Sequence, residues 1–94
     1  MPAFFYMLRL RSGRLSSGAT TDLAQRLADH QSGTACRTTA YDHPVSLVHT
    51  ESFETFPEAR RREAQVKRWT RAKKEALSAG DLALLKVLSR RSAP

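Results

Sequence analysis

The spacing of hydrophobic residues in the N-terminal part of the chain predicts a β-hairpin. The run at 4–10 (FFYMLRL) has the length of a strand. Its large side chains alternate between two faces, with Phe4, Tyr6, Leu8 and Leu10 on one and Phe5 and Met7 on the other. Because both faces are apolar, we expect a central strand that is covered on both sides. The turn signal Ser12-Gly13 and the short run at 15–19 predict a second strand beside it.

A helical spacing of apolar residues follows the hairpin and predicts the first helix. Residues 20–22 (TTD) offer N-cap chemistry, and Gly33 marks the expected end. The apolar positions between them fit an amphipathic helix: Leu23, Ala24, Leu27 and Ala28. Residues 34–44 are typical of a loop. The run at 45–48 (VSLV) then predicts a third strand that continues towards Phe53.

The C-terminal part of the chain has the signals of three more helices. Thr55 followed by Glu58 is a capping box, and it predicts a helix that runs to about Arg68. A helix over 70–79 should end at Gly80, and a last short helix carries leucines at 82, 85 and 88. The predicted order is ββαβααα. It indicates an α/β (α+β) fold in which a small three-stranded antiparallel sheet is flanked by helices.

Length and composition limit the class of protein. The chain has 94 residues and one cysteine, so we expect a single domain over residues 1–88, a flexible tail at 89–94 and no internal disulfide. No apolar run approaches the roughly 20 residues of a membrane-spanning helix. We therefore expect a cytoplasmic protein, taken to be a monomer, with no membrane partner.

The net charge of +7 is concentrated in the C-terminal part of the chain. Residues 1–56 are neutral overall, whereas eight basic residues lie between positions 60 and 74. A localised basic surface of this kind attracts a polyanion, most often nucleic acid. The alternative is a solvated helix face whose excess of Lys and Arg serves solubility.

Three polar residues stand out from the hydrophobic pattern. Arg26 and His30 are four residues apart, so they share one face of the first helix. Glu63 lies on or beside the apolar stripe of its own helix, where a carboxylate needs a cation, hydrogen-bond donors or a metal as partner. An ion pair with Arg60 or Lys67 and a metal site explain the pattern equally well.

The order and spacing of five segments carry a family resemblance over residues 4–77. The segments are FFYML, LSSG, TTDLAQRLADH, PVSLVH and PEARRREAQVKRWTRAKKEAL. Together they resemble the small stand-alone bacterial (YhbQ-like) branch of the GIY-YIG endonuclease superfamily. Tyr6 matches the tyrosine of the first signature. The second signature, Tyr-x-Gly in most members, falls on Ser16-Ser17-Gly18, so Gly18 is kept and Ser16 replaces the tyrosine.

The resemblance implies a divalent-metal-dependent endonuclease that acts on DNA rather than RNA, with low or structure-dependent specificity. It assigns catalytic roles to Tyr6, Arg26, His30 and Glu63. Glu63 would hold Mg²⁺ or Mn²⁺, Arg26 would contact non-bridging phosphate oxygens, and Tyr6 would take a proton from water. His30 would contact the phosphate or position water. The predicted nucleic-acid-binding residues are the cations of the C-terminal helices: Arg60, Arg61, Lys67, Arg68, Arg71, Lys73 and Lys74.

Two departures from the family pattern keep other functions open. Serine at position 16 is too short to replace a phenol. The loop at 36–44 (CRTTAYDHP) is less basic than in relatives, which predicts a weaker grip on phosphate. The alternatives are a nucleic-acid-binding module with impaired catalysis and a protein-interaction domain that docks a partner on the helix with the 82, 85 and 88 leucines.

Overall fold

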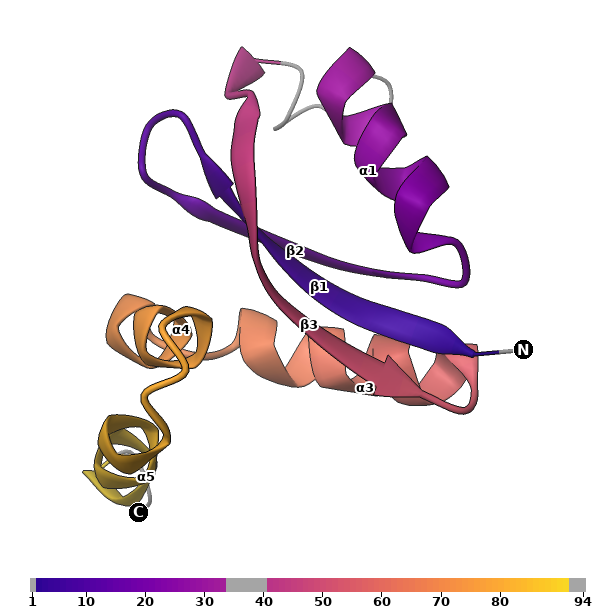
Figure 1. Ribbon diagram of the computed structural model, residues 1–94. Helices are drawn as coiled ribbons and strands as arrows, with labels where there is room; N and C mark the ends of the chain where they lie inside the picture. The colour runs from indigo at the N-terminus through magenta and orange to yellow at the C-terminus, as the bar shows by residue number, and fades with distance from the viewer. Residues whose placement is uncertain (1, 34–40, 92–94) are drawn as a thin grey trace.

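A three-stranded antiparallel sheet forms the centre of the computed structural model, which describes residues 2–33 and 41–91 (Figure 1). Strand β1 (Ala3–Leu10) lies between β2 (Leu15–Thr20) and β3 (Pro44–Phe53). Tyr6 is opposite Gly18 in β2 and Thr50 in β3. The predicted hairpin, the central place of its first strand and the order ββαβααα are thus confirmed.

Helix α1 (Leu23–Ser32) covers one face of the sheet. Asp22 caps it by accepting a hydrogen bond from the Gln25 backbone at 3.1 Å. Gly33 ends it in the left-handed region with φ 80°, which glycine adopts without a steric cost. Two of its leucines pack against the buried side chains of that face, which are Tyr6, Leu8 and Leu10. This layer holds α1 over the middle of β1.

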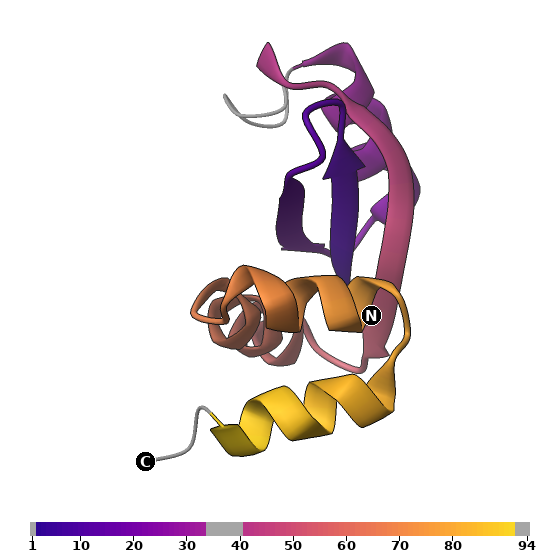
Figure 2. The ribbon, with the colours of Figure 1, turned by 90° about the vertical axis from the view of Figure 1, so that its left-hand side faces the viewer.

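Helices α3 (Phe56–Lys67) and α4 (Arg71–Ser78) cover the opposite face. Val66 and Leu77 are buried there with Phe5 and Met7 of β1. The alternation of large side chains in β1 therefore serves two separate cores, as its sequence predicts. Helix α5 (Leu82–Arg91) lies against α4 on the side away from the sheet (Figure 2).

The cap of one helix and the end of another differ from the sequence prediction. Helix α3 begins where expected, but the Thr55 side chain makes no capping bond to a backbone N–H and instead donates to the Glu58 carboxylate at 2.8 Å. The predicted capping box is therefore absent. Helix α5 extends to Arg91, beyond Leu88. Residues 34–40 of the predicted loop and 92–94 of the predicted tail lie outside the described residues.

A part-buried ion pair fixes α4 to the central strand. The Arg9 guanidinium donates two hydrogen bonds to the Glu75 carboxylate, at 2.7 and 2.6 Å. The same guanidinium donates to the backbone oxygen of Gly13 in the hairpin turn at 2.8 Å. The bonds from Arg9 lower the pKa of Glu75. Bidentate geometry of this kind specifies orientation as well as contact, so the pair sets α4 beside the hairpin turn.

Candidate functional site

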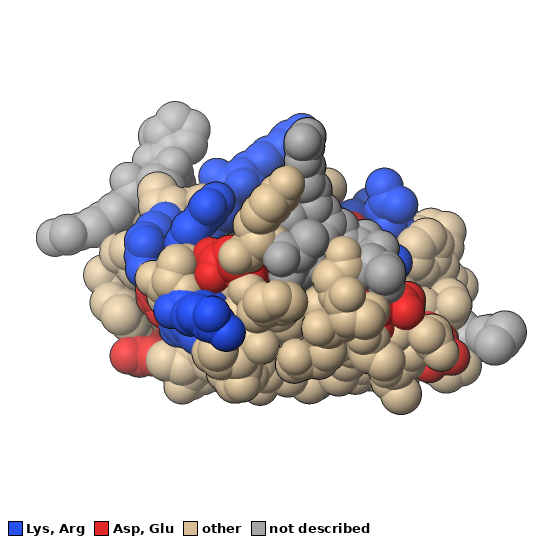
Figure 3. Space-filling view, turned by 90° about the horizontal axis from the view of Figure 1, so that it is seen from above, with Lys and Arg blue, Asp and Glu red and all other residues tan. Residues whose placement is uncertain are grey.

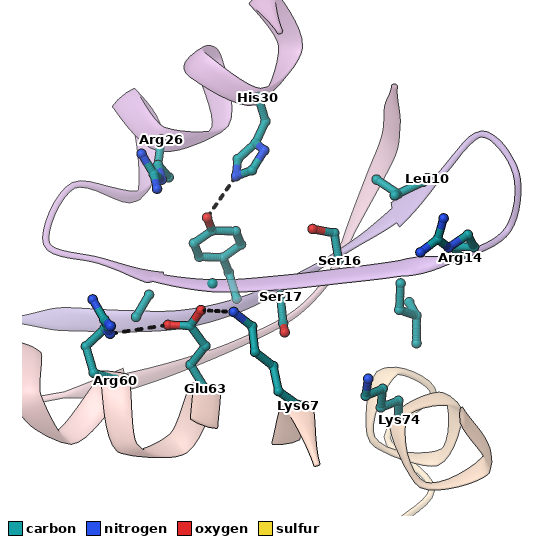
Figure 4. A pocket seen from close by; sticks show the side chains of 14 residues that line it. Leu10, Arg14, Ser16, Ser17, Arg26, His30, Arg60, Glu63, Lys67 and Lys74 are labelled. Carbon is teal, nitrogen blue, oxygen red and sulfur yellow. Dashed lines mark hydrogen bonds and ion pairs between the residues drawn. The ribbon is translucent and has the colours of Figure 1, made fainter. Parts of the chain in front are cut away.

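A cleft of about 480 Å³ opens along the β2 edge of the sheet, between α1 and α3 (Figure 4). Its walls come from β1, β2, the hairpin and all three helices that flank the sheet. The residues that line it are Tyr6, Leu10, Arg14, Leu15, Ser16, Ser17, Gly18, Ala19, Arg26, His30, Arg60, Glu63, Lys67 and Lys74. The cleft thus brings together all four residues to which the family resemblance assigns catalysis.

Tyr6 and His30 form a buried pair on the α1 side of the cleft. The Tyr6 hydroxyl lies 2.8 Å from Nε2 of His30, and the two residues are 2% and 3% exposed. Burial and the positive charge of Arg26 lower the pKa of His30, and they outweigh the opposite effect of Asp29. The imidazole is therefore neutral at neutral pH. In the tautomer with its proton on Nδ1, Nε2 accepts the hydrogen bond that Tyr6 donates.

Gly18 is required by the close approach of Tyr6 to strand β2. The two residues are opposite each other in the β1–β2 pairing. A Cβ atom at position 18 would lie 2.6 Å from Cζ of Tyr6, far inside van der Waals contact. Only glycine leaves room for the phenol to lie across this strand. The predicted importance of Gly18 thus has a steric basis in this chain.

Ser16 and Ser17 line the cleft from opposite faces of β2. Ser16 pairs with Leu8 and points towards α1, whereas Ser17 points towards α3 (Figure 4). Tyr6 is therefore the phenol that the described residues supply to this cleft. The sequence prediction named Ser16 and omitted Ser17, whose place follows only from the strand register.

Glu63 faces the cleft from α3 and forms both ion pairs that its sequence position allows. Lys67 Nζ lies 2.8 Å from Oε2, and Arg60 Nε lies 3.6 Å from Oε1. The Glu63 side chain is 15% exposed, whereas those of Lys67 and Arg60 are 59% and 64% exposed. The carboxylate is thus held in the cleft wall, with two cations reaching it from the solvent side.

The donor set at Glu63 suits a cation that is held mainly by water and substrate. Among the described residues there is no group of three or more His, Cys, Asp or Glu side chains placed to bind a metal. Mg²⁺ commonly binds through one or two carboxylates and completes its shell with water and phosphate oxygens. A single carboxylate at the wall of an open cleft fits that pattern. Lys67 competes for the same oxygen.

The predicted nucleic-acid-binding residues fall into two groups. Arg60, Lys67 and Lys74 line the cleft, and Arg71 lines a smaller depression of about 190 Å³ that adjoins it. Arg14 lines both depressions and is absent from the sequence prediction. Its place depends on the packing of the hairpin turn beside α4, which has no signal in the local sequence.

The remaining predicted cations do not line the cleft. Arg61 lines a depression beside Phe53. Lys73 Nζ lies 4.4 Å from the ring centroid of Trp69, and Arg68 is exposed. Seen from above, Lys and Arg side chains gather at the end of the molecule that carries the hairpin turn (Figure 3). The basic surface of the cleft therefore extends towards this end.

Comparison with known proteins finds close similarity to one family. The family model described as the GIY-YIG catalytic domain matches residues 2–76. A UPF0213 protein of Halobacterium salinarum is 43% identical over 72 residues, which are 77% of this chain and 94% of the relative. A UPF0213 protein of Bacillus velezensis is 46% identical over 72 residues, covering 77% of this chain and 73% of the relative.

A solved structure shares the fold. The solution NMR structure of a UPF0213 protein from Bacillus halodurans aligns with a TM-score of 0.53 and 32% identity, covering 100% of this chain and 89% of that one. In the described part of this chain, every helix is too short or too polar to cross a bilayer.

Proposed function

This chain belongs to the family of GIY-YIG catalytic domains, and from that premise we propose that residues 1–88 form a divalent-metal-dependent endonuclease that hydrolyses phosphodiester bonds in DNA. One observation carries the proposal. Tyr6, Arg26, His30 and Glu63 come from three different elements and converge on a single cleft. A core tyrosine, a helix cation and an ion-paired glutamate with purely structural roles would have no reason to share one solvent-open site.

The charge around the cleft supports a nucleic-acid substrate. Five cations line it: Arg14, Arg26, Arg60, Lys67 and Lys74. Glu63 is the one carboxylate among the described residues that line the cleft, so the charge there is positive overall. Contacts to phosphate fix the position of a nucleic acid but do not distinguish sequences. We therefore propose low or structure-dependent specificity, with the DNA backbone lying along the cleft and over the adjoining depression at Arg71.

The Tyr6–His30 pair supplies a route for the proton of the attacking water. Tyr6 donates its hydroxyl hydrogen to the neutral His30 imidazole. As this proton passes to Nε2, the phenol oxygen of Tyr6 takes the proton of a water in the cleft, and that water attacks phosphorus. Burial and Arg26 disfavour the resulting imidazolium in the free protein, and the negative charge of a bound phosphate would stabilise it. The bond to Tyr6 supports a role for His30 as proton acceptor, beside the phosphate or water contact expected from the sequence.

Arg26 and Glu63 are placed to manage the charge of the phosphate. Arg26 lines the cleft on the same helix as His30, and its guanidinium would stabilise charge that builds up on non-bridging oxygens in the transition state. Glu63 would hold Mg²⁺ or Mn²⁺, and such an ion, when bound, supplies positive charge at the leaving oxygen. In the free protein, Lys67 and Arg60 pair with the Glu63 oxygens that would hold the ion.

The ion pairs of Glu63 also favour a second candidate, a nucleic-acid-binding module without catalysis. Lys67 pairs with Oε2 at 2.8 Å. The resemblance described above also implies that Ser16 replaces a second phenol. In such a protein the cleft would bind DNA, and Glu63 would serve only to anchor the two cations. The two functions differ in one result, which is cleavage of the bound strand.

The test is incubation of the purified chain with labelled single- and double-stranded DNA and RNA in Mg²⁺, Mn²⁺ or EDTA. We expect cleavage of DNA in either metal and none in EDTA. Glu63→Gln should remove cleavage and keep binding, whereas Glu58→Gln, an exposed carboxylate on the same helix, should change neither. Undiminished cleavage in EDTA would contradict the metal requirement. Binding of DNA without cleavage by the wild type would establish the second candidate.

A further inference from the structure

The ammonium group of Lys67 forms the closer of the two ion pairs on the carboxylate that would hold a metal. Its Nζ lies 2.8 Å from Oε2 of Glu63, across one turn of α3. The Glu63 side chain is 15% exposed, whereas that of Lys67 is 59% exposed. Of the two partners, Lys67 is therefore the one that can move. Its flexible four-carbon stem lets the charge reach other positions in the same cleft.

The ammonium and a metal exclude each other at this oxygen. Mg²⁺ binds carboxylate oxygens at about 2.1 Å. With Lys67 in place, the two cations would lie within about 5 Å of each other, a distance at which like charges strongly disfavour the shared site. Binding of a metal at Glu63 thus requires Lys67 to leave and to find another anion.

A phosphodiester in the cleft is the anion that would receive Lys67. Lys67, Glu63 and Arg26 line the same cleft, with Lys67 and Glu63 on the α3 side and Arg26 on the α1 side (Figure 4). A phosphate bound between these two sides would offer the lysine a second anion. Arg60 is less suited to this exchange. Its Nε is 3.6 Å from the other oxygen, and its guanidinium lies 5.8 Å from the ring centroid of Phe56 at the start of the helix.

We infer that Lys67 couples metal binding to substrate binding: it occupies Glu63 in the free protein and transfers to the substrate phosphate, so that Glu63 accepts the metal only when nucleic acid is present. The inference rests on the proposed function, since it takes Glu63 as the metal residue. Lys67 is then a positioning residue that keeps the free protein from loading metal without substrate. By linkage, the metal must strengthen nucleic-acid binding by the same factor.

The test measures Mn²⁺ affinity directly, by the electron paramagnetic resonance signal of free Mn²⁺, and needs no cleavage. The wild type should bind weakly alone and about 5- to 150-fold more tightly with a phosphorothioate DNA duplex, which resists hydrolysis. Lys67→Met should bind Mn²⁺ about tenfold more tightly than wild type without DNA and lose most of the coupling. Two controls, the duplex without protein and the duplex with Glu63→Gln, measure how much Mn²⁺ the DNA binds by itself.

Three further variants separate the coupling from general effects. Lys86→Met removes an exposed lysine of α5 and should leave metal affinity unchanged. Lys67→Arg keeps the charge and should keep weak binding in the free protein. Lys67→Gln replaces Lys67→Met if thermal denaturation shows that the methionine variant is unfolded.

The outcomes distinguish this inference from the proposed function. Equal Mn²⁺ affinity of wild type and Lys67→Met without DNA, or no binding by either, overturns the inference, even if the wild type cleaves DNA. Coupling in the wild type that Lys67→Met abolishes supports it, even if the chain cleaves nothing and the proposed function fails.

Discussion

Alanine at position 18 tests whether the close contact between β2 and Tyr6 builds the site. Its Cβ would lie 2.6 Å from Cζ of Tyr6, a separation that forces the phenol to move. Alanine is ordinarily better than glycine in a strand by about 0.5–1 kcal/mol, so propensity alone predicts stabilisation. Overpacking of a core instead costs about 1–3 kcal/mol. Strand propensity thus predicts a higher free energy of unfolding for Gly18→Ala, and overpacking predicts a lower one.

The assay for Gly18→Ala combines thermal denaturation with DNA cleavage. For a domain of this size, each kcal/mol lost lowers Tm by roughly 4–8 °C. Displacement of the hydroxyl from His30 should also lower the cleavage rate by about 10²-fold, the lower end of what a general acid–base contact contributes. In a Tyr6→Leu background the clash is relieved, and Gly18→Ala should lose most of its effect on Tm. A Tm that is unchanged or higher in Gly18→Ala would refute the reasoning.

Three other predictions concern charge. Arg26→Ala should lower the cleavage rate about 10²-fold with little change in DNA affinity, since it removes a contact made to transition-state charge; single-turnover rates and binding titrations check this. The double variant Arg14→Glu, Lys74→Glu should weaken binding to DNA of every sequence and reduce the slope of log K against log salt by up to roughly 0.9 per lost phosphate contact. Arg61→Glu, outside the cleft, should change the slope much less. Equal effects of the two would contradict a DNA backbone that lies along the cleft. Because the pKa of His30 lies below its ordinary value of 6.5, the free energy of unfolding should fall as pH decreases from 6.5 towards the folded-state pKa, and denaturation curves of His30→Gln should lack this part of the pH dependence.

The layers of the fold could be predicted because their signals are local. Alternation within β1 specifies two apolar faces, and both are covered. The cap at Asp22 and the left-handed Gly33 bound α1 as its sequence indicates. At Thr55 the same kind of signal predicted the start of α3 but not the partner of the hydroxyl, since the Glu58 carboxylate competes with the backbone for it.

From the hydrophobic pattern alone, Glu63 is the site candidate that conflicts with its own element, whereas Tyr6 is named through the family resemblance. Glu63 interrupts an apolar stripe, and it lies largely buried in the cleft wall. The Tyr6–His30 bond spans 24 positions and depends on how α1 docks on the sheet, so no local pattern contains it. Arg14 reaches the cleft because the Arg9–Glu75 pair sets α4 beside the hairpin turn. These long-range contacts decide which cations face the substrate.

The most direct test of the central claim, that the four residues act as one catalytic site, is a cleavage-rate cycle. Single-turnover rates are measured in Mg²⁺ for wild type, Tyr6→Phe, Glu63→Gln and the double variant, with Tm as the control for folding. Residues that act as a unit are strongly non-additive, so the double variant should be no slower than the slower single variant. Two results would contradict the account. One is a metal-dependent cleavage rate that is the same in Tyr6→Phe as in the wild type. The other is a double variant whose fold-loss in rate equals the product of the two single fold-losses.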